Sequence, residues 1–302
     1  ASFSTLLLLL VSDEFWMLFL ATILFAIFRS PLIPLLNAFT LQYGKERKID
    51  FARFRVWGSL GYILAAIVLG KLIDLTSSRM VLYGMLVSLG LCGLSWGRGV
   101  SWKGEGFEGF WREFGRALGE KRLLTFLLVG HLTWMSWSAY SNFFTIHLEN
   151  LGISKGAAGW AWALGVVGEV VLMFGWRRIG SRFLPQDLLK AGLILVAARW
   201  FLYSLVRSTL AILSVQLLHG VTFALFYLAS MAILDEMSPP GLRATSQGMY
   251  SAFTFGLGSF LGGLGSGFLF DRFGMALLFR VSSLLALIAL LLYSSTSRRL
   301  RA

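Results

Sequence analysis

Four ionisable side chains lie near the middle of long apolar stretches of the chain: Glu169, Arg199, His219 and His131. If these stretches cross a bilayer, a charge at the centre costs about 2.5–3.5 kcal/mol on insertion scales, which makes each a candidate functional residue. A carboxylate, a guanidinium and an imidazole at similar depth can share a proton and a salt bridge. The pattern predicts that Glu169, Arg199 and His219 couple a proton to ligand binding. The alternative is a Glu169–Arg199 pair that only holds two helices together, with His219 hydrogen-bonded to a carbonyl.

Arg29 lies in the apolar stretch 15–42, shortly before Pro31 and Pro34. The prolines are expected to break the helix there, and no acidic residue of the stretch lies at helical spacing to neutralise the guanidinium. Arginine binds carboxylates in a bidentate geometry. We therefore expect Arg29 to meet an anionic ligand, with Asn37 further along the same stretch as a second contact. The alternative is an acidic partner for Arg29 on a helix outside this chain.

Arg55, Ser59 and Tyr62 have the spacing i, i+4 and i+7, which places them on one face of a helix. That face offers a cation, a hydroxyl and an aromatic ring to a ligand, and Trp57 adds a second ring nearby. Arg53, at the start of the same stretch, is better explained as a charge that sets membrane orientation.

Trp134 and Asn142 belong to an aromatic-rich segment that also holds His131, Trp137 and Tyr140. Aromatic side chains at membrane interfaces explain most such clusters. We expect only the part beside His131, including Trp134 and Asn142, to reach a cavity and contact a ligand.

Catalytic and metal-binding motifs are missing from the sequence. Cys92 is the single cysteine, and no paired nucleophile or ligand accompanies the three histidines. We therefore predict no catalytic residue, no metal site and no cofactor. One enzymatic alternative is an intramembrane acyltransferase with His131 or His219 as base, which would turn over acyl donors without an ion gradient.

The composition identifies the elements that must hold these residues. Of 302 residues, 57% are hydrophobic and 14% charged, against about 25% charged in soluble domains. Apolar runs of about 20 residues recur, the length of a membrane-spanning helix. The sequence thus predicts an all-α integral membrane protein in a lipid bilayer. The expected spans are 15–42, 51–75, 80–97, 123–147, 156–176, 188–206, 209–234, 245–270 and 275–296, with a partial one at 1–11.

The net charge of +12 does not indicate nucleic-acid binding, because the basic residues lie between the apolar runs. Nineteen of the 27 Lys and Arg residues fall on one side of the expected topology. By the positive-inside rule that side is cytoplasmic, which predicts a cytoplasmic C-terminus. The membrane that we expect is a bacterial-type inner membrane. The 19 residues lie in the segments 44–55, 98–122, 177–190, 235–245 and 297–302.

One long linker divides the chain into residues 1–97, 98–121 and 122–302. Within the linker, apolar residues recur at helical spacing opposite charged ones, which favours an amphipathic helix at the membrane interface; a simple tether is the alternative. These apolar residues are Phe107, Phe110, Trp111, Phe114 and Leu118. The two flanking parts are expected to be helical bundles.

The two parts also share a short repeat. Gly70 to Asp74 and Gly267 to Asp271 each follow a glycine-rich span and read Gly-x-x-x-Asp. Related halves are typical of transporters. The first copy is preceded by a shorter segment than the second, by two helices and part of a third. We expect the chain to lack about the first two helices of a six-plus-six bundle. One alternative to a transporter is therefore that this chain, without those helices, transports nothing by itself.

Three segments resemble the major facilitator superfamily, in the branch that contains lactose permease and the phenylpropionate permease. They are Phe51-Ala-Arg-Phe-Arg-Val-Trp-Gly-Ser-Leu-Gly-Tyr62, Trp162-Ala-Leu-Gly-Val-Val-Gly-Glu169 with Ala198-Arg-Trp200, and Gln216-Leu-Leu-His-Gly-Val-Thr-Phe223 with Pro239-Pro-Gly-Leu-Arg243. The resemblance covers nearly the whole chain. It implies two six-helix halves, residues 1–97 holding the end of the third helix to the sixth and residues 122–302 the seventh to the twelfth, and it implies a monomer.

By this resemblance Arg55 corresponds to the substrate-facing arginine of the fifth helix, Arg199 to the coupling arginine of the ninth and His219 to the histidine of the tenth. Glu169 lies about one turn from the acidic residue that lactose permease uses on its eighth helix. Asn37 and Thr222 replace a sugar-binding and a proton-carrying glutamate of that permease, so a galactoside site is not expected and Glu169 would carry the proton.

The leading hypothesis is a secondary active transporter that works by alternating access, with a proton and a small organic solute as its partners. The solute expected is an aromatic carboxylate such as 3-phenylpropionate. Arg29 and Arg55 would meet its carboxylate, and Trp57 and Tyr62 its ring. The alternative within the superfamily is a proton symporter for a sugar or nucleoside.

Overall fold

The computed structural model describes residues 5–6, 8, 14–77, 79–96, 115, 119–153, 155–238 and 243–297. Every element in this part of the chain is helical, which confirms the predicted all-α fold. The predicted amphipathic linker lies almost entirely outside the described residues. The helices are α2 (Phe15–Arg29), α3 (Leu32–Arg47), α4 (Phe51–Leu75), α5 (Met80–Trp96), α7 (Lys121–Asn150), α8 (Lys155–Gly180), α9 (Pro185–Tyr203), α10 (Thr209–Met237), α11 (Arg243–Tyr250), the π-helix η1 (Ser251–Leu257) and α12 (Gly258–Ser297).

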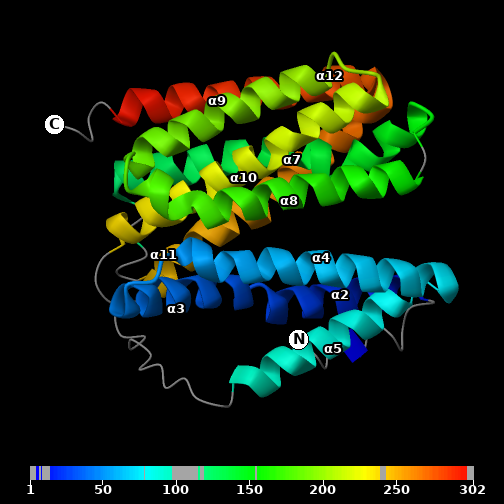
Figure 1. Cartoon of the computed structure of the whole chain (residues 1–302), viewed down its shortest axis with the longest axis horizontal. Coiled ribbons are helices and arrows are strands. Elements are labelled where there is room, and N and C mark those ends of the chain that lie inside the picture. The colour runs from blue at the N-terminus through cyan, green and yellow to red at the C-terminus, as the bar shows by residue number, and fades with distance from the viewer. Residues whose placement is uncertain are drawn as a thin grey trace.

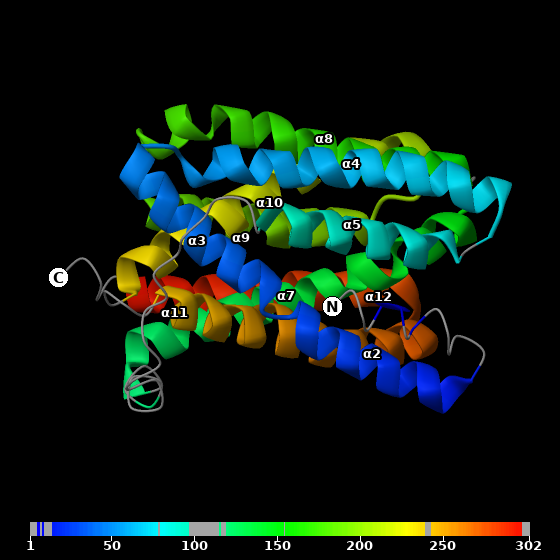
Figure 2. The same ribbon diagram turned by 90° about the horizontal axis from the view of Figure 1, so that it is seen from below.

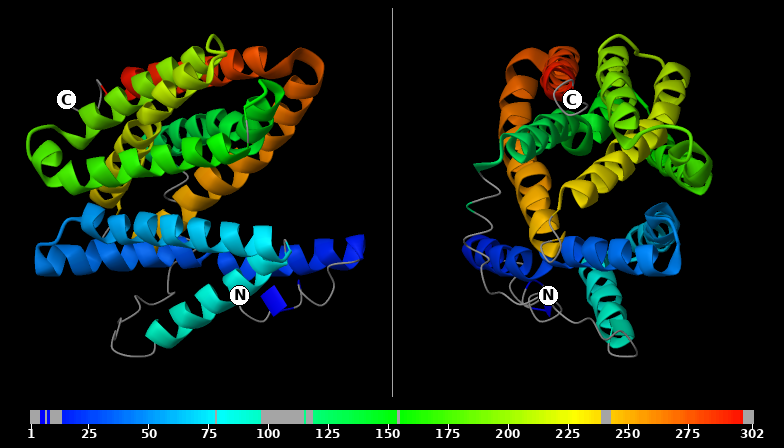
Figure 3. Two further views of the ribbon diagram at one scale, coloured as in Figure 1. Left: turned by 45° about the vertical axis from the view of Figure 1, so that its right-hand side comes forward. Right: turned by 90° about the vertical axis from the view of Figure 1, so that its left-hand side faces the viewer.

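The helices form two groups, α2 to α5 and α7 to α12, which lie one above the other in Figure 1 and are seen as separate layers in Figure 3. Within the second group α7 packs along α12, and α10 packs against both α8 and α9. The groups meet where α4 lies along α8, as Figure 2 also shows, and where α3 crosses α11. This junction between the groups contains most of the predicted site residues.

The predicted break in the first long span falls at Ser30–Pro31, between α2 and α3. The Ser30 amide still donates to the Ala26 carbonyl, which closes the last turn of α2. Pro31 has no amide hydrogen to continue the helix, and it is tolerated where a new helix begins. Ser30 and Pro31 keep right-handed helical dihedral angles, so Phe15–Arg47 still forms one membrane-length segment with an interruption after Arg29.

A second break divides α12. Gly274 has φ 73° and ψ −179°, a conformation that glycine adopts without the steric cost that a Cβ would bring. The two arms of α12 correspond to the end of the predicted span 245–270 and to the span 275–296. The other predicted spans coincide with α4, α5, α7, α8, α9 and α10 to within a few residues.

Three helical segments of the described chain are long and apolar enough to span a bilayer: Phe15–Arg47, Thr209–Met237 and Thr245–Thr296. Met80–Leu94 is a shorter apolar helix. Helices α7 and α9, whose residues are all described, are not among these segments, although both are predicted as spans. Polar side chains account for the difference in α7, where His131, Thr133 and Ser136 are buried against neighbouring helices rather than exposed.

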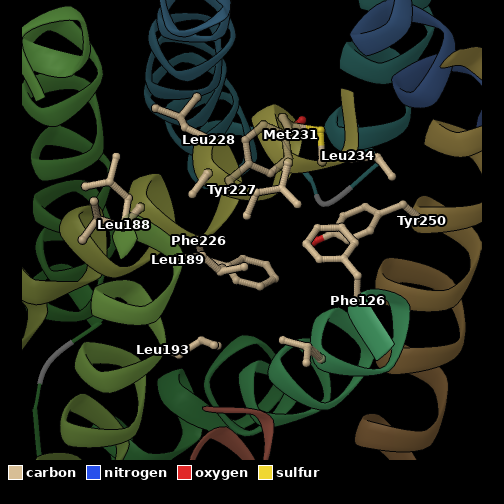
Figure 4. Packing of buried hydrophobic residues seen from close by; sticks show 14 of the residues in the cluster. Phe126, Leu188, Leu189, Leu193, Phe226, Tyr227, Leu228, Met231, Leu234 and Tyr250 are labelled. Carbon is tan, nitrogen blue, oxygen red and sulfur yellow. The ribbon is translucent and has the colours of Figure 1, made fainter. Parts of the chain in front are cut away.

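One apolar core cluster lies mainly in the second group of helices, and Ala52 and Val56 of α4 extend it across the junction. Figure 4 shows its labelled members: Phe126, Leu188, Leu189, Leu193, Phe226, Tyr227, Leu228, Met231, Leu234 and Tyr250. Many other large apolar side chains, such as Trp16 and Leu210, remain exposed on outer faces. Exposed apolar faces are what a helix needs where its surroundings are lipid tails rather than water.

Candidate substrate site

A cavity of about 690 Å³ lies at the junction, between the α2–α3 break on one side and α7, α11, η1 and α12 on the other. Its walls carry one cation, three hydroxyls and two aromatic rings, provided by Arg29, Ser30, Ser251, Ser259, Trp134 and Phe255. Cavities of this size, mostly apolar with a few polar groups, are typical of small-molecule sites. Two predicted ligand residues, Arg29 and Trp134, thus line one space.

The two predicted residues have different surroundings in the cavity wall. The Arg29 guanidinium carbon lies 6.0 Å from the centre of the Phe25 ring, and Arg29 forms no ion pair with any residue that the structure describes. Trp134 is fixed: its Nε1 donates a 2.8 Å hydrogen bond to Ser259 Oγ, and its ring packs edge-on against Phe255 at 4.5 Å. The cavity therefore combines an oriented aromatic ring with a cation that has no ion pair in the part of the chain that the structure describes.

A second group of polar residues, which we call the junction cluster, lies where α3 and α4 meet α8 and α10. It consists of Asn37, Arg55, Ser59, Glu169 and Tyr227. Ser59 donates a 2.6 Å hydrogen bond to Glu169 Oε1, and the Tyr227 hydroxyl donates to Asn37 Oδ1 at 3.1 Å. The Arg55 guanidinium lies 5.1 Å from the Tyr227 ring centre. Glu169 is 6% exposed, so a carboxyl group is buried between the two groups of helices.

The junction cluster adjoins the cavity through aromatic contacts. The rings of Tyr227 and Phe255 lie 6.4 Å apart, and Phe255 belongs to the cavity wall. Four predicted residues in the cluster and two in the cavity therefore form one continuous region.

Arg199 and His219 lie in a separate cluster inside the second group of helices. Arg199 is fully buried, with its guanidinium carbon 4.5 Å from both the Tyr140 and Trp200 ring centres and Nη1 3.4 Å from Thr222 Oγ1. Its Nε and Nη2 have no hydrogen-bond partner among the described residues. The His219 ring centre is 5.1 Å from that of Tyr140. We call these residues the Arg199 cluster.

Glu169 and Arg199 do not form the pair that was the structural alternative to coupling. Glu169 lies on the side of α8 that contacts α4, and its hydrogen bond goes to Ser59. Arg199 projects from α9 among side chains of α7 and α10. Because α4 belongs to the other group of helices, Glu169 joins the two groups instead of two neighbours within one.

Trp57, Tyr62 and Asn142 are not brought to the cavity or to the junction cluster. Trp57 is 75% exposed, since it lies two positions from both Arg55 and Ser59, which at about 100° per residue turns it to the opposite face of α4. Tyr62 is 55% exposed, although the spacing placed it on the face of Arg55. Asn142 is also exposed and lies beside Gly263 of α12. This arrangement does not give Trp57 and Tyr62 the ligand-ring contact expected of them.

Several residues of the region were not identified from the sequence. Ser251, Phe255 and Ser259 carry no charge, and of the three Ser259 follows the π-turn, whose extra residue turns it toward the cavity. The sequence does offer an indication for Tyr227, because a phenol in an apolar stretch needs a hydrogen-bond partner when it is buried. Its partner, Asn37, was identified, but the pairing depends on how the two groups of helices meet.

A charged cluster closes the junction at the end of α10. Asp235 is buried and forms ion pairs with Lys45 of α3 and with Arg243 of α11, whose Nε lies 2.8 Å from Asp235 Oδ1. Lys45 and Asp235 belong to different groups of helices. The junction is therefore held by charge at this end and by the junction cluster further along.

Residues 1–281 match the MFS_1 like family. The chain belongs to this family. It is 29% identical over 305 residues to the "Probable 3-phenylpropionic acid transporter" of Escherichia coli, covering 95% of this chain and 78% of the relative. It is 24% identical to the "Maltose permease" of Geobacillus stearothermophilus, over 92% of this chain and 71% of that one.

Among solved structures, the fold of this family member is similar to that of the nucleoside transporter NupG (D323A mutant). The TM-score is 0.63 at 16% sequence identity, over 85% of this chain and 71% of that chain. The chain is thus a multi-pass membrane protein with the major facilitator fold. The names of its relatives support transport of a small molecule rather than catalysis.

Proposed function

We propose that this family member is a proton-coupled symporter for a small aromatic carboxylate and that the junction cavity binds the solute. The observation that carries the proposal is that Arg29, which has no ion pair among the described residues, lines one cavity together with the Trp134 and Phe255 rings. A carboxylate pairs with the guanidinium, and an aromatic ring packs on the facing rings. The relative named for 3-phenylpropionic acid supports this class of solute.

Glu169 is the proposed proton carrier. It is buried at the junction, bonded to Ser59, and the nearby cation is Arg55 on the Tyr227 ring. A solute carboxylate that draws Arg55 toward the cavity removes a positive charge from the surroundings of Glu169, and a buried carboxylate without a nearby cation takes up a proton. Solute and proton would then bind together, as symport requires.

Arg199 and His219 are proposed to support this coupling through the ring wall. Trp137 lies 5.3 Å from the Arg199 guanidinium and 5.4 Å from His219, and it stacks on Trp134 at 5.9 Å. A shift of the Arg199 cluster would thus move the ring that faces the solute. In this proposal Arg199 and His219 act through the ring wall and do not exchange a proton directly with Glu169.

Alternating access would require the junction to open at either end in turn. The ion pairs of Asp235 close one end here, and by the positive-inside rule this end is cytoplasmic. We also propose that the protein is a monomer in a bacterial-type inner membrane, with its C-terminus in the cytoplasm.

Proton flux in proteoliposomes tests the function. Full-length protein is reconstituted, and external pH is recorded as 3-phenylpropionate is added, then lactose. Alkalinisation with 3-phenylpropionate alone is the expected result. If neither solute changes the external pH, in protein shown to be folded, the result would contradict the proposed solute and leave the fold and family unaffected.

A sugar or nucleoside symporter is the second candidate. The hydroxyl and amide groups of Tyr227, Asn37 and Ser59 suit neutral polar solutes, and a maltose permease is among the relatives. Maltose and uridine in the same assay separate the two candidates.

A further inference from the structure

The π-helix η1 interrupts the helix that forms one wall of the cavity. Its i→i+5 hydrogen bonding accommodates one residue more than an α-turn, and such turns are rare and frequently occur at functional sites. At 3.6 residues per α-turn, one extra residue changes the direction of every following side chain by about 100°. The π-turn therefore decides which side chains of early α12 face the cavity.

One carbonyl of this turn has a hydrogen-bond partner on another helix. The Gly258 amide donates to Phe253 O, five residues earlier, and His131 Nδ1 of α7 lies 2.9 Å from the same oxygen. A carbonyl only accepts hydrogen bonds, so Nδ1 must carry the proton. Phe253 O thus receives two hydrogen bonds, one from within the π-turn and one from a neighbouring helix.

The residues of the next turn show which side chains the π-turn directs toward the cavity. A Cβ on Gly258 would lie 3.2 Å from His131 O and 3.3 Å from Trp134 Cβ, so little more than a glycine fits there. Directly after it, Ser259 accepts the Trp134 hydrogen bond and lines the cavity, whereas Phe260 is 61% exposed on the outer side. An uninterrupted α-helix from the same start would bring Leu257 to the place of Gly258 and turn Ser259 to the outer side.

We propose that His131 is a positioning residue for the cavity wall. By holding Phe253 O it fixes the π-turn, and the π-turn makes Ser259 and the Trp134 ring face an aromatic acid. This inference rests on the proposed function, in which the cavity binds the solute. His131 acts on the solute only through η1 and Trp134.

Thiol labelling tests the register without any transport. Cys92 is replaced by Ser, and single cysteines are placed at Ser259, Ser251 and Phe260. With native His131, a membrane-impermeant thiol reagent should label S259C and S251C but not F260C. In His131→Leu, which cannot donate, labelling of S259C should fall about tenfold, equivalent to about 1.4 kcal/mol, while S251C, upstream of the shift, keeps its rate.

His131→Asn is the matched variant, because its amide can donate to Phe253 O from a position near that of Nδ1. It should restore labelling of S259C, and in uptake assays it should keep the KM for 3-phenylpropionate that His131→Leu raises. Unchanged labelling of S259C in His131→Leu would overturn the inference. An equal fall in the labelling rates of S251C and S259C would also overturn it, because it would mean that His131 supports the bundle as a whole. Absence of 3-phenylpropionate uptake with the labelling pattern intact would count against the proposed function alone.

Discussion

At the residue scale, the chemistry of this family member is concentrated in a few buried polar groups with unequal partners. Glu169 has a hydroxyl partner and a nearby cation, whereas Arg199 has aromatic faces and two nitrogens without a hydrogen bond among the described residues. Burying an unpaired charge is costly, and aromatic faces return only about 0.5–2 kcal/mol each. These two residues therefore allow separate tests of coupling and stability.

Glu169→Gln keeps the size and the hydrogen-bonding capacity of the side chain and removes its titration. If Glu169 carries the proton, gradient-driven uptake of 3-phenylpropionate should fall to background while exchange of labelled for unlabelled solute persists. Both are measured in the same proteoliposomes. Loss of exchange together with uptake would instead assign Glu169 a structural part in the junction.

Arg199→Met removes a buried charge that has no carboxylate partner among the described residues. We expect the thermal unfolding midpoint in detergent to stay level or rise, because the desolvation cost disappears, while uptake falls at least about tenfold. Arg199→Lys is the control that keeps the charge and loses the planar stack on the rings. A large fall of the midpoint in Arg199→Met would show that the cation–ring contacts stabilise the bundle.

At the element scale, close helix crossings set where the functional side chains point. Helices α8 and α10 approach at Gly168 and Gly220, where a Cβ on Gly220 would overlap the backbone of Gly168 and Glu169. Small residues permit such approaches in membrane bundles. The position of Glu169 at the junction thus depends on a glycine of another helix.

Gly220→Ala should destabilise the protein by about 1–3 kcal/mol, the usual cost of overpacking, and reduce uptake by displacing Glu169. Gly175→Ala in α8 is the matched control, because no atom lies within 4 Å of its Cβ position. Thermal unfolding and uptake are measured for both. Equal stability and equal uptake in the two variants would show that the α8–α10 crossing does not set the position of Glu169.

At the scale of the whole molecule, the two groups of helices are joined by few contacts, and those at the end of α10 are ionic. Asp235→Asn leaves Lys45 and Arg243 without their shared partner. We expect the junction to open more often at this end. In a Cys92→Ser background, a cysteine at buried Leu41 of α3 should then be labelled several-fold faster by a water-soluble thiol reagent. Asp235→Glu should restore slow labelling, and no change in Asp235→Asn would rule out an ionic closure.

The sequence by itself determined the all-helical membrane fold, the break before Pro31 and the positions of most helices. These depend on local properties: the apolar content of about 20 residues, the missing amide hydrogen of proline and the lack of side chains on glycine. It also indicated Arg29, Asn37, Arg55, Ser59 and Glu169 as residues of interest, because buried polar groups are costly wherever they occur.

Only the tertiary structure decided which of these residues meet. Glu169 is bonded to Ser59 of a distant helix rather than paired with Arg199, and Tyr62 is exposed although its spacing matched that of Arg55. Helical spacing fixes which side chains share a face, but not which face meets a neighbour. That choice depends on contacts between distant segments, such as the Gly168–Gly220 crossing, and on the one-residue shift of the π-turn, neither of which leaves a local pattern in the chain.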